Sequence, residues 1–120
     1  MARARVQAMI LGGGLGTRMK SAVPKVLHDV LGHPMVWYVV EAVRGLDASP
    51  VLVTPPGNDV FREFFGASVL YAEQPQHLGS GHAVQCGMGS VTAEYVLICN
   101  GDNPLPSSED YEEFVDACLS

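Results

Sequence analysis

Residues Val6 to Lys25 read Val-Gln-Ala-Met-Ile-Leu-Gly-Gly-Gly-Leu-Gly-Thr-Arg-Met-Lys-Ser-Ala-Val-Pro-Lys. The first six predict a buried strand, and the glycines that follow predict a loop at its carboxyl end. Several backbone N–H groups of such a loop can face an anion. The planar guanidinium group of Arg18 suits two phosphate oxygens, and Lys25 adds a compact positive charge. The stretch therefore predicts a polyphosphate site, and the alternative is a glycine-rich turn with two solvated cations.

The spacing of these glycines excludes two common phosphate loops. A dinucleotide fingerprint needs G-x-G-x-x-G, but its last position falls on Thr17 or on Met19, depending on the first glycine chosen. A P-loop needs G-x-x-x-x-G-K-[ST], and Met19 again stands where the second glycine is required. The loop is therefore of a different type.

Strand and helix patterns alternate along the rest of the chain. Short apolar runs predict strands at 51–53, 68–71 and 95–99, the last buried on both faces. Apolar spacing predicts helices from about residue 34, over 59–65 with a stop at Gly66, over about 80–89, and from residue 107 or 108. Three glycines make the helix at 80–89 the weakest of these. We expect an α/β fold, with a three-layer, Rossmann-like, mostly parallel sheet and flanking helices.

Composition and charge narrow the possible functions. The chain has 120 residues, is 48% apolar and carries a net charge of −6, which argues against a nucleic-acid partner. Five of its seven Lys and Arg residues lie at or before Lys25, as an anionic ligand there would favour. No run approaches the roughly 18 apolar residues of a membrane span. Three cysteines without metal spacing predict reduced, mostly buried thiols, so we expect a cytoplasmic protein without a membrane partner.

Two further motifs follow predicted strands. Leu78-Gly79-Ser80-Gly81-His82-Ala83 can bring backbone close to a flat base, and either Gln76 or His77 could read the base edge. Asp102, after the strand at 95–99, is placed to hold Mg²⁺ through one carboxylate oxygen. The alternatives are a helix start that serves packing alone and an Asx turn. We interpret His82 as structural rather than catalytic, and His28 and His33 as loop residues.

The motifs together resemble one enzyme family. The pattern G-x-G-T-R-M-K-S-x-x-P-K over Gly14–Lys25 resembles the sugar-nucleotide pyrophosphorylases, and more closely the bacterial N-acetylglucosamine-1-phosphate uridylyltransferases. The segment from Leu78 resembles the family's L-G-T-G-H-A, and the segment from Gly101 resembles its G-D-x-P-L. The family usually has Gln directly before the Leu, where this chain has His77.

The resemblance implies a function and a site. The function is uridylyl transfer from UTP to N-acetylglucosamine 1-phosphate, with Mg²⁺ as cofactor and pyrophosphate as the second product. The implied catalytic residues are Arg18 and Lys25, and the metal ligand is Asp102. Nucleotide binding is assigned to Leu11, Gly13, Gly14, Gly16, Thr17, Arg18, Lys25, Gln76, His77, Gly79, Ser80 and Gly81.

The resemblance also bears on domain organisation. We expect residues 1–120 to form a single, truncated unit, the nucleotide-binding amino half of a nucleotidyltransferase domain. Such a unit would turn over little substrate and would be open to self-association. Two alternatives remain, namely a non-catalytic nucleotide-binding fragment and a related nucleotidyltransferase with a different base or acceptor.

Overall fold

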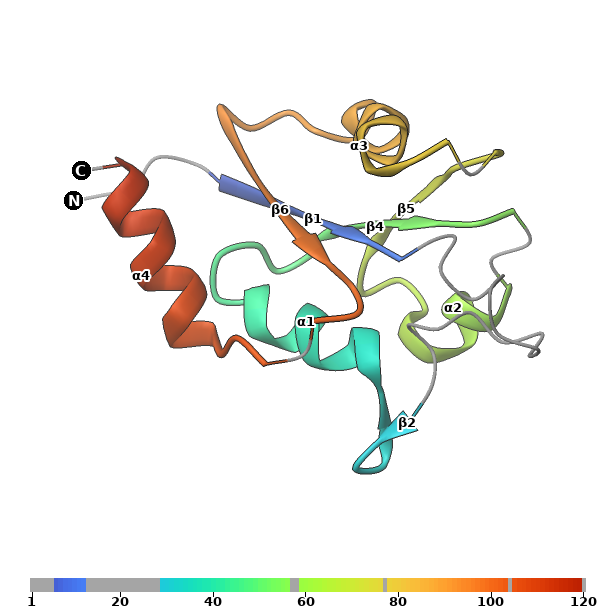
Figure 1. The fold of residues 1–120 in the computed structure, drawn as a ribbon, viewed down its shortest axis with the longest axis horizontal. Helices are drawn as coiled ribbons and strands as arrows, with labels where there is room; N and C mark the ends of the chain where they lie inside the picture. Colours follow the sequence, from blue (N-terminus) through green and yellow to red (C-terminus); the bar gives the residue numbers. More distant parts are fainter. Residues whose placement is uncertain (1–5, 13–28, 57–58, 77, 104, 120) are drawn as a thin grey trace.

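A computed structural model describes residues 6–12, 29–56, 59–76, 78–103 and 105–119 (Figure 1). Six strands and four helices lie within these ranges. In chain order they are β1 (Val6–Leu11), β2 (Asp29–Val30), β3 (His33–Pro34), α1 (Met35–Val43), β4 (Val51–Thr54), α2 (Asp59–Phe65), β5 (Leu70–Glu73), α3 (Ser80–Met88), β6 (Tyr95–Asn100) and α4 (Ser108–Leu119).

The main sheet has four parallel strands in the order β5-β4-β1-β6. β1 is central, and it pairs with β6 from Val6↔Tyr95 to Leu11↔Asn100. Its residues Ala8, Met9 and Ile10 are fully buried, as a continuous apolar run predicts for a strand covered on both faces. The predicted parallel α/β sheet is confirmed.

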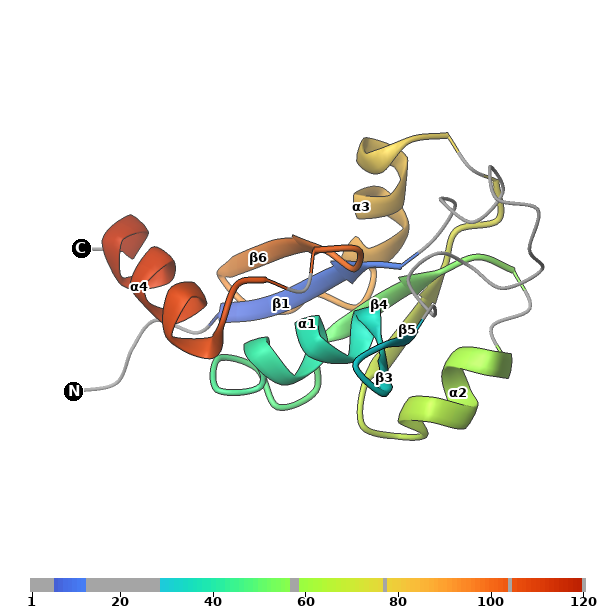
Figure 2. The same cartoon turned by 60° about the horizontal axis from the view of Figure 1, so that its bottom comes forward.

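Helices cover both faces of this sheet and make three layers (Figure 2). On one face, side chains of β1 such as Ile10 pack with α1, with Phe61 of α2 and with Val115 of α4. On the other face, Met9, Val51 and Val53 pack against Ala83 of α3. Alternating residues of one strand therefore supply two separate cores.

Helix α3 approaches the sheet closely at Gly87. A Cβ atom at this position would lie 2.7 Å from Cε of Met9 and 3.0 Å from Cγ2 of Val53. The residue is buried, so a side chain at this position would require Met9 and Val53 to shift or α3 to move away from the sheet. The low helix propensity that we noted from the sequence is thus offset by packing.

The connection between the glycine loop and α1 contains a hairpin that the sequence did not predict. β2 and β3 pair in antiparallel register across Leu31 and Gly32, which have φ values of 50° and 92°. His33, interpreted above as a loop residue, lies in β3 and stacks on Trp37 with 3.9 Å between ring centroids. That interpretation is wrong because the stacking and the hairpin hold this residue in place.

The sequence predicts that β6 is buried on both faces, and the structure differs. β6 is an edge strand, and Tyr95 and Ile98 are 48% and 45% exposed. α3 packs mainly on β1, β4 and β5, and on that face of β6 Val96 is half-buried against the core whereas Ile98 is exposed. The strand at 68–71 also begins later than predicted, at Leu70.

The three cysteines are free, but only part of the prediction about their burial is right. Cys99 is buried, Cys86 is half-buried and Cys118 is exposed, because Cys118 lies on a surface turn of α4. None of the described helices is both long and apolar enough to span a membrane.

Candidate functional site

The sheet has a topological switch point between β1 and β6. From β1 the chain proceeds through β4 to β5 on one side, and it then returns to place β6 on the other side. In sheets of this kind, ligands bind outside the carboxyl ends of the strands at such a point. Here those ends are Leu11 and Asn100, which are register partners.

Backbone hydrogen bonds continue past the last residues of these strands. The N–H of Gly101 donates to the carbonyl of Leu11 at 3.0 Å, and the N–H of Gly12 donates to the carbonyl of Val53 at 2.8 Å. A Cβ on Gly12 would lie 3.0 Å from that Val53 oxygen, so only glycine fits without displacement. The start of the glycine loop and the start of the Asp102 turn are therefore fixed side by side.

Several predicted site residues lie outside the described ranges. They are Gly13, Gly14, Gly16, Thr17, Arg18, Lys25 and His77. Their assigned roles in phosphate and base binding remain predictions. Leu11 is described, and it ends β1 as a half-buried residue directly before the loop.

Asp102 lies in the turn that follows β6. Gly101 is buried, Asp102 is half-buried, and the N–H of Asn103 donates to the carbonyl of Asn100 at 3.2 Å. Within the described ranges, no group of three or more His, Cys, Asp or Glu side chains could enclose a metal ion. A single, partly exposed carboxylate at this edge fits Mg²⁺ that keeps waters and phosphates as its other ligands.

Residues 74–76 and 78–81 lie at the same edge of the sheet, between the end of β5 and the first turn of α3. Gln76, Gly79, Ser80 and Gly81 are exposed. Gly79 has a φ of 96°, which favours glycine, and it precedes α3 without a side-chain cap. The first N–H groups of a helix have no intrahelical partner, so those of α3 can meet a hydrogen-bond acceptor on a ligand.

Gln74 is a residue of this segment that sequence reasoning missed. It is 4% exposed, and its Nε2 lies 3.3 Å from the Gly79 carbonyl and 3.1 Å from Nδ1 of His82. On the other side of the ring, Nε2 of His82 lies 3.8 Å from Sγ of Cys86. The alternation of β5 could have revealed it, because Gln74 shares with Ala72 the face that packs against α3.

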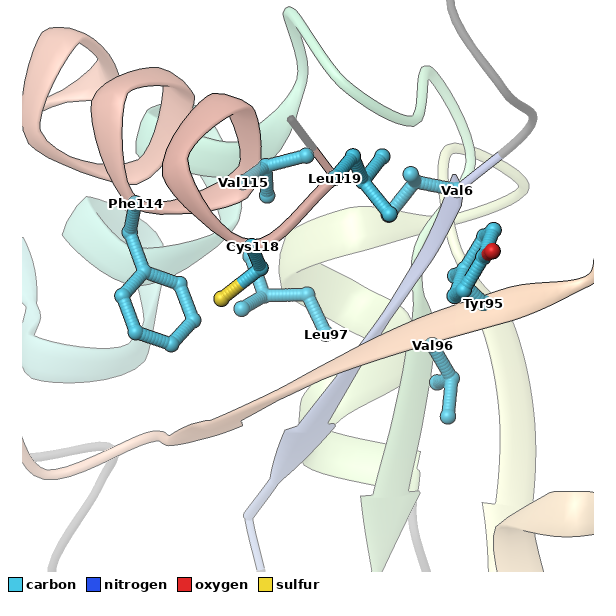
Figure 3. Close-up of a pocket in the computed structure, with 8 residues that line it drawn as sticks. All are labelled: Val6, Tyr95, Val96, Leu97, Phe114, Val115, Cys118 and Leu119. Atoms are coloured by element: carbon cyan, nitrogen blue, oxygen red, sulfur yellow. The ribbon is translucent and has the colours of Figure 1, made fainter.

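A cavity elsewhere in the molecule does not suit a nucleotide. It lies between α4 and β6, has a volume of about 130 Å³, and is lined by apolar side chains together with Tyr95 and Cys118 (Figure 3). Val6 and Tyr95, which line it, begin their strands, so the cavity is at the amino end of the sheet. No cationic side chain is among its lining residues, and a polyphosphate would find no charge partner there.

Comparison with known proteins shows which family this chain resembles. A family model described as the MobA-like NTP transferase domain matches residues 8–120. The bifunctional protein GlmU of Alcanivorax borkumensis is 47% identical over 109 residues, which cover 89% of this chain and 24% of that protein. GlmU of Caldanaerobacter subterraneus is 42% identical over 94% of this chain and 25% of its own length. The chain thus spans about a quarter of these curated relatives.

A solved structure has a similar fold to this chain. CMP:2-keto-3-deoxy-manno-octonic acid synthetase, solved with CTP, superposes with a TM-score of 0.70 at 22% identity. The match covers 95% of this chain and 47% of that one. At this identity the match supports the fold alone.

Proposed function

This chain belongs to the MobA-like NTP transferase domain family, and from that premise we propose that it forms the nucleotide-binding part of a uridylyltransferase. The proposed reaction joins UTP to N-acetylglucosamine 1-phosphate and releases pyrophosphate. The sugar-nucleotide specificity rests on the motif resemblance and on the GlmU relatives. The hydrogen bond between Gly101 and Leu11 at the switch point is the observation that supports the proposal, because it holds the end of β1, where the glycine loop begins, beside the turn that carries Asp102.

In the proposed mechanism, an oxygen of the sugar 1-phosphate attacks the α-phosphorus of UTP, and the bond to pyrophosphate breaks. The nucleophile is already an anion, so the protein needs no strong base. Its contribution is positioning and charge neutralisation. Amides of the glycine loop and Arg18 hold the β- and γ-phosphates, and Lys25 offsets charge near the α-phosphate. Asp102 would hold Mg²⁺, which supplies charge to phosphate oxygens when it is bound.

The base is proposed to lie against the segment from Gln76 to Gly81. Exposed N–H groups at the start of α3 and the glycine backbone on both sides of Ser80 give a flat ring close access. Gln76 is exposed and His77 is its neighbour, so either side chain is a candidate for reading the base edge. Uracil is the proposed base, and cytosine is the alternative that a triphosphate panel would detect.

A second candidate is nucleotide binding without turnover by this chain. The chain spans about a quarter of the length of its curated relatives, so binding and turnover need separate assays. Calorimetry with UTP measures the first, and pyrophosphate release in the presence of N-acetylglucosamine 1-phosphate measures the second. UTP binding without release would favour the second candidate, and absence of UTP binding would contradict both.

The decisive variant is Asp102→Asn, which keeps the shape of the side chain and removes its charge. We expect UTP affinity to increase with Mg²⁺ in the parent and to lose that dependence in the variant. Asp116→Asn is the matched control, because it removes the same charge from an exposed position of α4, a helix whose last turns pack beside the amino ends of β1 and β6. If Asp102→Asn responds to Mg²⁺ as the parent does, the metal assignment is wrong.

A further inference from the structure

Three side chains link the loop before α3 to the body of that helix. Gln74 is buried directly after β5, His82 is half-buried in the first turn of α3, and Cys86 follows four residues later on the same helix face. Nε2 of Gln74 contacts both the Gly79 carbonyl (3.3 Å) and Nδ1 of His82 (3.1 Å). The chain of contacts ends at Sγ of Cys86, 3.8 Å from the other ring nitrogen.

The direction of each hydrogen bond follows from the partners. A backbone carbonyl only accepts, so the amide group of Gln74, and not its oxygen, must face Gly79. The second N–H of that amide group then donates to Nδ1 of His82. An accepting Nδ1 requires the ring proton to be on Nε2, where it points to the weak sulfur acceptor of Cys86. Neither of the two Gln74 contacts described here uses its side-chain oxygen.

We propose that His82 is a positioning residue for residues 78–81 of the proposed base site, an inference that rests on the proposed function. Its Nδ1 fixes the amide of Gln74, and that amide in turn holds the carbonyl of Gly79. Gly79 has a φ of 96° and directly precedes the first turn of α3. The backbone that would meet a pyrimidine nucleoside triphosphate is thus held by a ring that need not touch the ligand.

Loss of the Nδ1 acceptor would leave one N–H of a buried amide without its partner. Such a group costs more than an average hydrogen bond contributes, so the amide would rotate toward another acceptor. The same rotation would break the hydrogen bond from Nε2 of Gln74 to the Gly79 carbonyl. We therefore expect the segment to open more often and to bind the base less tightly.

Three substitutions at position 82 separate acceptor chemistry from packing. His82→Leu removes the acceptor. His82→Asn places an oxygen near the position of Nδ1, whereas the longer side chain of His82→Gln places it near the position of Nε2. Gln85→Leu is the matched control, because Gln85 is exposed on the same helix. Among the three variants at position 82, only His82→Asn should behave like the parent.

The first measurement needs no ligand. Long-range ¹H–¹⁵N correlation on the parent should show the ring proton on Nε2. Amide hydrogen exchange at Gly79, Ser80 and Gly81 should accelerate about tenfold in the Leu and Gln variants, and it should return toward the parent rate in the Asn variant. A proton on Nδ1, or equal exchange rates in the Asn and Gln variants, would overturn the inference even if the Leu variant failed to fold.

The second measurement is titration with UTP and CTP. We expect about tenfold weaker UTP binding in His82→Leu, a smaller preference for UTP over CTP, and recovery of both in His82→Asn. Unchanged affinity alongside altered exchange would refute the link to base binding. If the parent shows the predicted ring proton and exchange pattern but binds no UTP, the proposed function fails, whereas the structural role of His82 in the loop stands.

Discussion

The side-chain oxygen of Gln7 accepts a hydrogen bond from the backbone N–H of Ala93 at 2.7 Å, although the two residues are 86 positions apart. The same oxygen accepts from the N–H of Thr92 at 2.5 Å, and Nε2 of Gln7 donates to the Ser90 carbonyl at 3.2 Å. Gln7 is 6% exposed in the central strand β1. The buried side-chain amide of Gln7 therefore forms hydrogen bonds with three backbone groups of the connection between α3 and β6.

We predict that Gln7→Leu destabilises the fold. The substitution replaces the amide by an apolar side chain of similar size and leaves backbone N–H groups without acceptors, which costs about 2–3 kcal/mol. Urea denaturation followed by circular dichroism measures the loss. Gln85→Leu, at an exposed position of α3, should change the free energy of unfolding by less than about 0.5 kcal/mol. Equal effects of the two substitutions would contradict the role assigned to Gln7.

Gly87→Ala tests the close approach of α3 to the sheet. Alanine has the better helix propensity by about 1 kcal/mol, but its Cβ would lie within 3.0 Å of Met9 and Val53, which are both fully buried. We expect overpacking to prevail, with a net loss of about 1–3 kcal/mol. Gly89→Ala is the control, because a Cβ there meets nothing within 4 Å and φ is −61°. A stabilised Gly87 variant would show that α3 can shift at no cost.

Cys99 and Tyr111 predict a pH dependence of stability. Burial raises the pKa of the Cys99 thiol from 9.0 to about 11, despite an opposing hydrogen bond with Tyr111, and burial also raises the pKa of Tyr111. Both groups bind protons more tightly in the folded state. Their contribution is therefore complete below pH 9 and declines as the pH rises toward 11. Thermal melts should show this decline, and Cys99→Ala should reduce its slope. An identical slope in the variant would exclude Cys99 as a cause.

Arg18→Ala tests the phosphate assignment in the part of the chain outside the described ranges. A charge-assisted contact is worth about 1.5–3 kcal/mol, so UTP binding should weaken by about tenfold to a hundredfold. Uridine binding should change little, because the guanidinium is assigned to phosphate. Lys20→Ala, which removes a charge two residues away, should have the smaller effect on UTP. Calorimetry that finds UTP and uridine weakened equally would show that the assignment is wrong.

The elements that the sequence predicted well are those with a continuous apolar pattern. β1 ends at Leu11 as expected, α2 occupies residues 59–65, and Gly66 ends it with a φ of 54°. In these elements the apolar pattern of the sequence agrees with the burial that the folded structure gives each residue. The hairpin of β2 and β3 was missed because each strand has only two residues and its turn begins with Leu31, a residue that rarely adopts a positive φ.

The candidate site was predicted only in part, and the misses have physical causes. Asp102 and Gly79 lie at the carboxyl edge of the sheet as expected, because turn residues after strands have a clear pattern, whereas their roles in binding remain predictions. Gln74 was overlooked because it belongs to a mostly polar stretch after β5, although its alternation with Ala72 places it on the face of the sheet that packs against α3. The burial of β6 was overestimated because a continuous apolar run in the sequence does not show whether the strand lies at the edge or in the middle of the sheet.

The central place of β1 has a consequence for synthesis of the chain. Among the strands of the main sheet β1 is synthesised before the others, yet its partner β6 begins 89 residues later, since Val6 pairs with Tyr95. At about 5–20 residues per second, the interval is roughly 5–18 s. During that time one edge of an almost entirely apolar strand has no partner from β6. A chaperone that binds extended apolar segments would find its target in β1, and it would have to release this strand before β6 could pair with it.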